Sequence, residues 1–153
     1  MKPKPEPTQA DIRLAAMDLL ARREHSRFEL RRKMLSREFA EPLVAEVLDA
    51  LTAEGLQSDA RFAETFVQSR MERGSGPRKI RAELRERGVA DERIADAMDA
   101  LDAEWPGLLR AVREKKFGPG LPVDYRERAR QMRFLQQRGF RPEQIARVLK
   151  DEE

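Results

Sequence analysis

Apolar residues recur in this chain with a period of about 50 residues, and this internal repeat limits its fold more than any other feature. A shift by one period aligns Leu30 with Ile80, Met34 with Leu84, Phe39 with Val89, Val44 with Ile94, Leu48 with Met98 and Leu51 with Leu101. A second shift aligns Leu84 with Leu135, Val89 with Phe140, Ile94 with Ile145 and Met98 with Leu149. Arg37, Arg87 and Arg138 also share one position. Such repeats indicate one supersecondary unit in three copies, stacked so that neighbouring units bury apolar surface that a single unit cannot bury alone.

Each copy carries start and stop signals for three helices, which are clearest in the first copy. Thr8 begins a stretch with apolar residues at helical spacing, and Ser26 with Glu29 forms an S-x-x-E capping box before a second stretch. Pro42 lies at the start of a third stretch, which ends at Gly55. Charged residues make up 39% of the chain and aromatic residues only 6%, a balance typical of helices with broad solvated faces. The sequence therefore predicts an all-α protein.

The repeat also predicts how the chain is divided. Residues 1–9 read as a disordered, proline-rich tail, followed by three-helix repeats at 10–55, 56–104 and 105–153. Phe62 and Phe66 are predicted core residues, and Trp105 is predicted to anchor the junction of the second and third repeats. The third repeat contains the glycine- and proline-rich segment 117–123, "FGPGLPV", a linker that should let this module adopt its own orientation.

Few residues are available for catalysis or metal binding. The chain has no cysteine, and its one histidine, His25, can supply neither a triad with a spare base nor more than one metal ligand. We interpret His25 as a polar residue at the junction before the Ser26 cap. Asp96, Asp99 and Asp102 could suggest a carboxylate cluster, but no carbonyl-rich loop accompanies them, which favours a solvated acidic face. We expect no enzyme, no catalytic residue, no metal and no cofactor.

The stretch "GSGPRKIRAELRERGV", residues 74–89, raises the question of a phosphate-binding loop. It lacks both the third glycine of a dinucleotide loop and the Gly-Lys-Ser/Thr ending of a P-loop. The same residues are explained by a helix start, with Gly76 as the N-cap and Pro77 as the first helical residue. The stretch therefore predicts a helix.

Charge alternates between the helices of each repeat. The second-helix segments 26–37, 77–87 and 124–138 are net basic, and the third-helix segments 41–54, 91–104 and 142–153 are net acidic. Stacked repeats would place basic helices along one side and acidic helices along another, although charge that merely solvates helices remains an equal alternative. A helix-turn-helix that reads DNA is disfavoured, because its recognition helix would bring negative charge into the major groove.

The beginning of the sequence, "MKPKPEPTQ", lacks the apolar run of a signal peptide, and no window approaches the length of a membrane span. Together with the absence of cysteine, this favours a cytoplasmic protein with no membrane partner.

Three segments resemble the RecX family of bacterial regulatory proteins: "HSRFEL", "GLQSDARFAETFVQSRMERGSGPRKIRAELRERGV" and "MRFLQQRGFRPEQIARVL". The most specific parts are "SDARFAETFV" and "GPRKIRAELRERGV", which occur in the expected order. The resemblance covers residues 10–150 and implies an elongated array of nine helices in three tandem three-helix repeats. It also implies binding to RecA, the recombinase that polymerises on single-stranded DNA. RecX-like proteins lodge in the groove of that filament, block ATP hydrolysis, strand exchange and repressor cleavage, and promote filament loss.

Applied to this chain, the resemblance implies a steric and electrostatic mechanism and a monomer that contacts RecA and single-stranded DNA, with double-stranded DNA as a further candidate. Basic side chains would face DNA phosphates or acidic RecA surface. The candidate residues are Arg22, Arg23, Arg31, Arg32, Arg78, Arg81, Arg85, Arg130 and Arg133. For each of them, an ordinary solvated arginine is an equally good interpretation. The alternative function is a nonspecific DNA-binding helical protein that competes with RecA for DNA.

Overall fold

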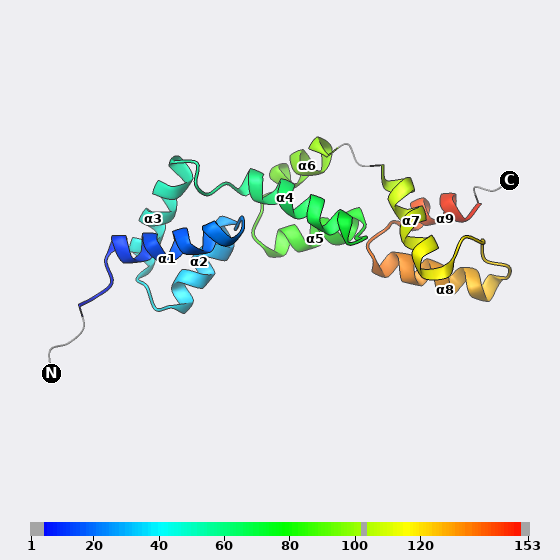
Figure 1. The fold of residues 1–153 in the computed structure, drawn as a ribbon, viewed down its shortest axis with the longest axis horizontal. Coiled ribbons are helices and arrows are strands. Elements are labelled where there is room, and N and C mark those ends of the chain that lie inside the picture. Colours follow the sequence, from blue (N-terminus) through cyan, green and yellow to red (C-terminus); the bar gives the residue numbers. More distant parts are fainter. Residues whose placement is uncertain (1–4, 102–103, 151–153) are drawn as a thin grey trace.

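The structure is a computed structural model that describes residues 5–101 and 104–150. These residues form nine α-helices and no strand, in an elongated row of three groups (Figure 1), which confirms the predicted fold class. The first group contains α1 (Gln9–Arg22), α2 (Arg27–Ser36) and α3 (Glu41–Ala53). The second contains α4 (Asp59–Glu72), α5 (Pro77–Glu86) and α6 (Asp91–Ala100), and the third contains α7 (Trp105–Phe117), α8 (Tyr125–Gln137) and α9 (Pro142–Lys150).

The predicted start signals begin the helices. Thr8 and Ser26 both form complete capping boxes, with Asp11 and Glu29 respectively. Gly76 is the N-cap of α5 and Pro77 its first residue, so the glycine-rich stretch is a helix start, as predicted. In each box the cap side chain and the box carboxylate satisfy N–H groups that the helix itself leaves without partners.

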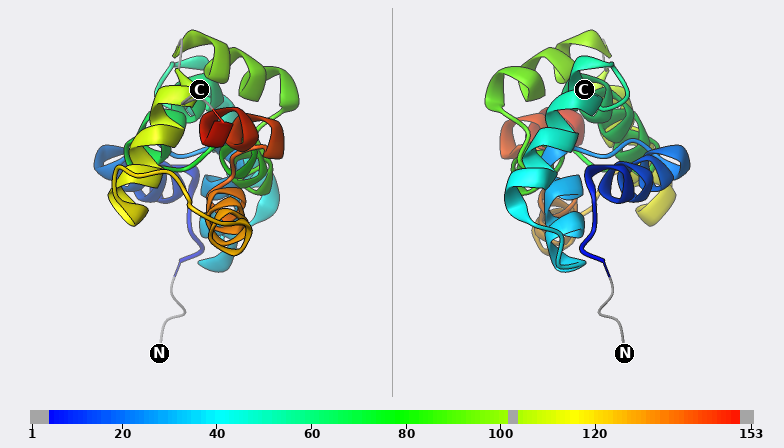
Figure 2. Two further views of the ribbon diagram at one scale, coloured as in Figure 1. Left: turned by 90° about the vertical axis from the view of Figure 1, so that its right-hand side faces the viewer. Right: turned by 90° about the vertical axis from the view of Figure 1, so that its left-hand side faces the viewer.

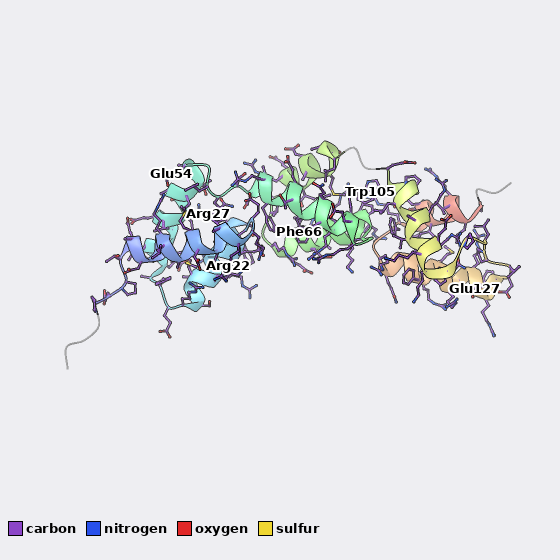
Figure 3. The ribbon with its side chains drawn as sticks, in the orientation of Figure 1. Arg22, Arg27, Glu54, Phe66, Trp105 and Glu127 are labelled. Atoms are coloured by element: carbon purple, nitrogen blue, oxygen red, sulfur yellow. The ribbon has the colours of Figure 1, made fainter. Side chains whose placement is uncertain are left out.

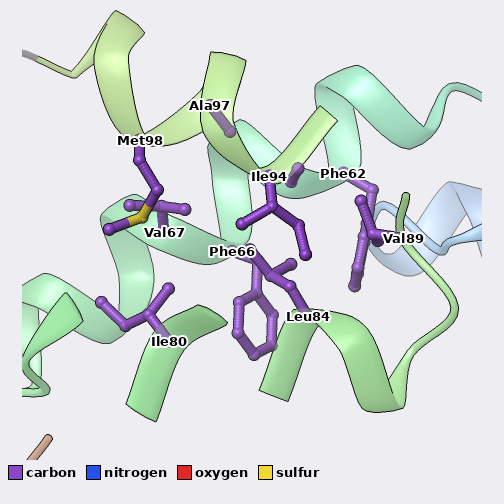
Figure 4. Packing of buried hydrophobic residues seen from close by; sticks show 10 residues of the cluster. Phe62, Phe66, Val67, Ile80, Leu84, Val89, Ile94, Ala97 and Met98 are labelled. Atoms are coloured by element: carbon purple, nitrogen blue, oxygen red, sulfur yellow. The ribbon is translucent and has the colours of Figure 1, made fainter. Parts of the chain in front are cut away.

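Each three-helix unit has its own hydrophobic core, and the repeat register is confirmed by burial. The aligned positions Met34, Leu84 and Leu135 are all fully buried. So are Leu30 and Ile80, and Figure 4 shows Ile80 and Leu84 packing with Phe62 and Phe66 in the second unit. The cores are separate because the most extensive helix packing lies within each unit.

Phe39 departs from the repeat for a physical reason. Its counterparts Val89 and Phe140 are buried, whereas Phe39 is only half-buried. Val89 and Phe140 follow glycines that contact the preceding unit, and the described residues contain no unit before the first one. The same apolar position is therefore covered less completely at the end of the row.

The units follow one another along the long axis (Figure 1), and a view along that axis superposes them (Figure 2). The three predicted basic helices, α2, α5 and α8, all lie toward the lower side of the row in Figure 1. Trp105 lies between the second and third units (Figure 3) and packs against both cores, as predicted.

Successive units meet through equivalent residues of their second helices. The N-cap residue Ser26 donates from its hydroxyl to the carbonyl of Arg87, the C-cap residue of α5. One unit further along, the backbone N–H of the N-cap residue Gly76 donates to the carbonyl of Arg138, the C-cap residue of α8, at 2.6 Å. Both junctions therefore connect the start of one second helix to the end of the next.

Two glycines allow this close approach. Gly88 and Gly139 follow the C-cap arginines of α5 and α8, with φ of 75° and 99°. A Cβ at Gly88 would lie 2.7 Å from the ring Cγ of Phe28, and one at Gly139 would lie 2.7 Å from the backbone nitrogen of Lys79. Both positions favour glycine because of conformation and contact together.

The segment 117–123 runs from Phe117, the last residue of α7, into the loop before α8, and its expected effect on the orientation of the third module stays a prediction. It connects α7 to α8 within the third unit, where the buried Arg113 holds it. One terminal nitrogen of Arg113 donates to the carbonyl of Gly120 at 3.0 Å, and the other donates to Pro119 at 3.3 Å. Sequence composition indicated a loop here but could not reveal this buried anchor.

Candidate partner and nucleic-acid interface

The nine predicted arginines do not form one site, because they are distributed over α1 and its C-cap, α2, α5 and α8 in all three units. Five of them are ion-paired. The pairs are Arg22 with Asp18 at 3.2 Å, Arg23 with Glu29 at 3.1 Å, Arg31 with Glu41, Arg85 with Asp91 at 2.9 Å and Arg130 with Glu127 at 2.8 Å. Figure 3 shows how far apart two of these pairs lie, with Arg22 on the first unit and Glu127 on the third.

The other four arginines have no acidic partner within the described residues. The guanidinium of Arg32 lies over the ring of Phe28, at 5.7 Å from its centroid. Arg78 and Arg133 are exposed and Arg81 is half-buried, and among the described residues none of these three side chains makes an ion pair or hydrogen bond. These three are the predicted residues whose charge is least compensated.

Helix α5 has two polar faces, and the predicted residues occupy only one of them. Arg85 faces the start of α6, where it pairs with Asp91. Lys79 and Glu83 lie on another face and line a cavity between α4, α5 and the end of α8. The spacing of Arg78, Arg81 and Arg85 places them on one face of α5, but it did not identify the other face, which lines the cavity.

Three cavities of about 380, 410 and 550 Å³ meet at Arg73, the C-cap residue of α4. The first is also lined by Arg23 and Arg87, between the first and second units. The other two are also lined by Arg138, and the largest by Lys79 as well, between the second and third units. A cationic groove therefore passes both junctions.

Aromatic rings hold several of these guanidinium groups. Arg70 and Arg87 lie 4.4 and 4.8 Å from the centroid of Phe66, and Arg138 lies 5.4 Å from that of Phe134. Arg70 also forms an ion pair with Glu83 at 2.9 Å. Such cation–π contacts fix the planes of the guanidinium groups.

The groove residues were missed as candidate contacts. They are Arg70, Arg73, Lys79, Arg87 and Arg138. One signal was present in the sequence, since Arg87 and Arg138 share a position in the repeat. That signal could not show that the shared position lies at a junction, because the junction depends on how units pack.

His25 is buried in the first unit, directly before the N-cap residue Ser26. Its Nδ1 lies 3.1 Å from the carbonyl oxygen of Arg23, and its Nε2 lies 2.9 Å from Nζ of Lys33. Because an ammonium group can only donate, Nε2 accepts and Nδ1 carries the proton. Burial lowers the pKa of the His25 imidazole, and the charges of Arg23 and Lys33 act in the same direction. His25 is therefore a neutral structural residue, in agreement with its interpretation from sequence.

No group of three or more possible metal ligands occurs within residues 5–101 and 104–150. Asp96 and Asp99 are exposed, and Asp102 lies outside the described residues. Among the described helices, none is long and apolar enough to cross a membrane.

Comparison with protein families matches all three units. The first three-helix domain of RecX matches residues 13–51, the second matches 58–98 and the third matches 107–149. This chain belongs to the RecX family. Relatives named "Regulatory protein RecX" include one from Halorhodospira halophila, 51% identical over 88% of this chain and 83% of the relative. Another, from Pseudomonas syringae pv. tomato, is 46% identical over 93% of this chain and 92% of the relative.

Solved RecX structures share the fold. The crystal structure of RecX from Lactobacillus salivarius superposes with a TM-score of 0.79 over 94% of this chain and 95% of that chain, at 22% identity. A second structure, the "Crystal structure of regulatory protein RecX", superposes with a TM-score of 0.81 over 94% of this chain and 73% of that chain, at 23% identity. The row of three-helix units is thus the RecX architecture.

Proposed function

We propose that this protein inhibits the RecA recombinase by binding RecA and the RecA–single-stranded DNA filament. In this proposal it limits ATP hydrolysis, strand exchange and the stimulated cleavage of the SOS repressor. The observation that carries the proposal is membership of the RecX regulatory family over all three units. The proposal includes a monomer that acts in the cytoplasm without a cofactor.

The elongated shape supports a steric mode of action. A row of three units, with arginine-rich second helices toward one side, suits a protein that lies along the groove of a helical filament (Figure 1). The candidate contacts remain the nine predicted arginines. Arg78, Arg81 and Arg133 are favoured because they make no ion pair, hydrogen bond or ring contact within the described chain. Arginine pairs with either phosphate or carboxylate, so both DNA and acidic RecA surface are suitable partners.

A RecA ATPase assay tests this proposal when single-stranded DNA is in large excess over the added protein. A filament regulator continues to inhibit at substoichiometric amounts, since it acts on filaments rather than on free strands. Loss of inhibition in excess DNA would instead favour the second candidate, a nonspecific DNA-binding protein that competes for strands. That candidate is supported by the same uncompensated arginines.

A further inference from the structure

The two junctions between units carry the same pair of arginines. Arg23 and Arg73 are the C-cap residues of α1 and α4, one repeat apart. Arg87 and Arg138 are the C-cap residues of α5 and α8, also one repeat apart. Arg23 and Arg87 line one cavity, and Arg73 and Arg138 line the next two. The fold therefore builds two equivalent cationic positions along one groove.

The two positions differ in the carboxylate that pairs with the first arginine. At the first junction, Glu29 accepts from both terminal nitrogens of Arg23, each at 3.1 Å. The repeat places Lys79 where Glu29 stands, so the carboxylate is replaced by a second cation. Arg73 and Lys79 make no side-chain ion pair or hydrogen bond within the described residues. Arg73 therefore lacks the carboxylate partner that its counterpart Arg23 has at the first junction.

The carboxylates near this second position leave an excess of positive charge. Glu83 is held by Arg70 at 2.9 Å, which leaves Glu86 as the other acidic residue lining the largest cavity. The cations that line the same cavity are Arg73, Lys79, Arg87 and Arg138. These four cations face a shared cavity of about 550 Å³.

The arginines at this position are already oriented. One terminal nitrogen of Arg87 donates to the carbonyl of Glu83 at 2.9 Å, while its guanidinium stacks on Phe66. One terminal nitrogen of Arg138 donates to the carbonyl of Arg73 at 3.4 Å, and its guanidinium lies over Phe134. Each guanidinium has five N–H donors, so donors remain for a ligand, and a side chain held in place loses less entropy when it binds.

We propose that Arg73, Lys79, Arg87 and Arg138, at the junction of α4, α5 and α8, bind the phosphate backbone of single-stranded nucleic acid. Guanidinium groups suit bidentate contacts with phosphate, and a groove that passes two junctions suits a linear polyanion. The rings of Phe66 and Phe134 are occupied by arginines, so base stacking on them is blocked and binding is independent of sequence. This inference deepens, and rests on, the DNA-contacting part of the proposed function.

The Lys79→Glu variant tests the site, because it recreates the charge arrangement that the first junction already tolerates. Binding of the full-length protein to an oligothymidylate is measured by fluorescence anisotropy over a series of salt concentrations. We expect weaker binding and a salt slope reduced by about 0.7 for each lost phosphate contact. Arg93→Glu is the matched control: it makes the same change of charge on exposed α6, away from the groove, and should retain the wild-type slope. Thermal melting of both variants checks that they fold.

A second variant, Arg138→Gln, keeps a polar side chain and should reduce the slope in the same way. Equal slopes for Lys79→Glu, Arg93→Glu and the wild type would overturn the inference, as would a wild type that does not bind the oligonucleotide. If Lys79→Glu weakens only RecA inhibition and leaves oligonucleotide binding intact, the groove takes an acidic protein surface and the inference is also wrong. If the wild type binds DNA through this groove but does not inhibit RecA, the inference stands while the proposed function fails.

Discussion

The hydroxyl of Ser26 donates a hydrogen bond of 2.8 Å to the carbonyl of Arg87, which lies 61 residues further along the chain. The same oxygen accepts from the backbone N–H of Glu29 at 3.1 Å, so one side chain both caps α2 and joins the first two units. A hydroxyl has one donor and two acceptor positions, which makes serine suited to both tasks. The hydrogen bonds at the first junction therefore connect the start of α2 to the end of α5.

Ser26→Ala should destabilise the protein by more than loss of a cap alone. A lost N-cap costs about 1 kcal/mol, and leaving the carbonyl of Arg87 without its partner adds about 1–3 kcal/mol. Ser58→Ala is the matched control, because Ser58 caps α4 by accepting from Arg61 N at 3.1 Å and makes no junction bond. Urea unfolding should show the larger loss for Ser26→Ala, and equal losses would mean that the junction bond contributes nothing.

Gly139→Ala should cost more than Gly55→Ala, although both glycines have positive φ. At Gly55, with φ of 77°, an added Cβ meets nothing within 4 Å, so only the backbone strain of about 1–2 kcal/mol applies. At Gly139 the added Cβ would overlap the Cβ of Lys79 and lie 2.7 Å from its backbone nitrogen, so the third unit must shift. Urea unfolding measures the cost, and solution scattering measures the displaced unit. A similar loss in both variants, with unchanged scattering, would contradict this account of the junction.

The shape itself is measurable in solution. A compact protein of this length has a radius of gyration of about 15 Å. A row of three units with separate cores should clearly exceed that value. A radius of gyration at or below the compact value, measured by small-angle scattering, would exclude both the elongated row and a groove-filling mode of action.

These junctions mark the limit of what the sequence could predict. Helix starts such as Ser26 and Pro77, and core positions such as Leu84 and Leu135, follow from local patterns, and the structure confirms them. The roles of Arg73, Lys79 and Arg138 depend instead on how one unit lies against the next. That packing is set by contacts between residues more than 60 positions apart, such as Arg138 with Arg73, and no local spacing records it.

Stability should fall as the pH drops below about 6.5, because His25 resists protonation in the folded state. Burial lowers the folded-state pKa of His25, so below its ordinary pKa the unfolded chain takes up a proton that the folded chain does not. The contribution of His25 to the free energy of unfolding is fully present above about pH 6.5. As the pH falls toward the folded-state pKa, this contribution declines by up to about 1.4 kcal/mol per pH unit.

The chain has one histidine, so an NMR titration of its ring measures this pKa directly. A value at or above about 6.5 would contradict the prediction. His25→Gln is the matching variant for urea unfolding between pH 7.5 and 5.5, taken as roughly the titration range of histidine. Its stability should depend less on pH over that range than the wild-type stability does. Glu29, whose pKa is lowered chiefly by its bonds to Arg23 and Ser26 against the opposing effect of burial, titrates below this window.

The triple variant Arg78→Ala, Arg81→Ala and Arg85→Ala tests the face of α5 that the sequence selected. Its melting temperature should hardly change, because alanine is a strong helix former and the exposed ion pair of Arg85 with Asp91 contributes only about 0–1 kcal/mol. If the three side chains contact phosphates, the salt slope of single-stranded DNA binding should fall by about 0.7 per contact. If they contact RecA, DNA binding should be retained while inhibition of the RecA ATPase weakens. Comparison with Lys79→Glu then separates the two polar faces of one helix. A triple variant with wild-type slope and wild-type inhibition would identify this face as ordinary solvated helix and leave the groove on the other side of α5 as the functional surface.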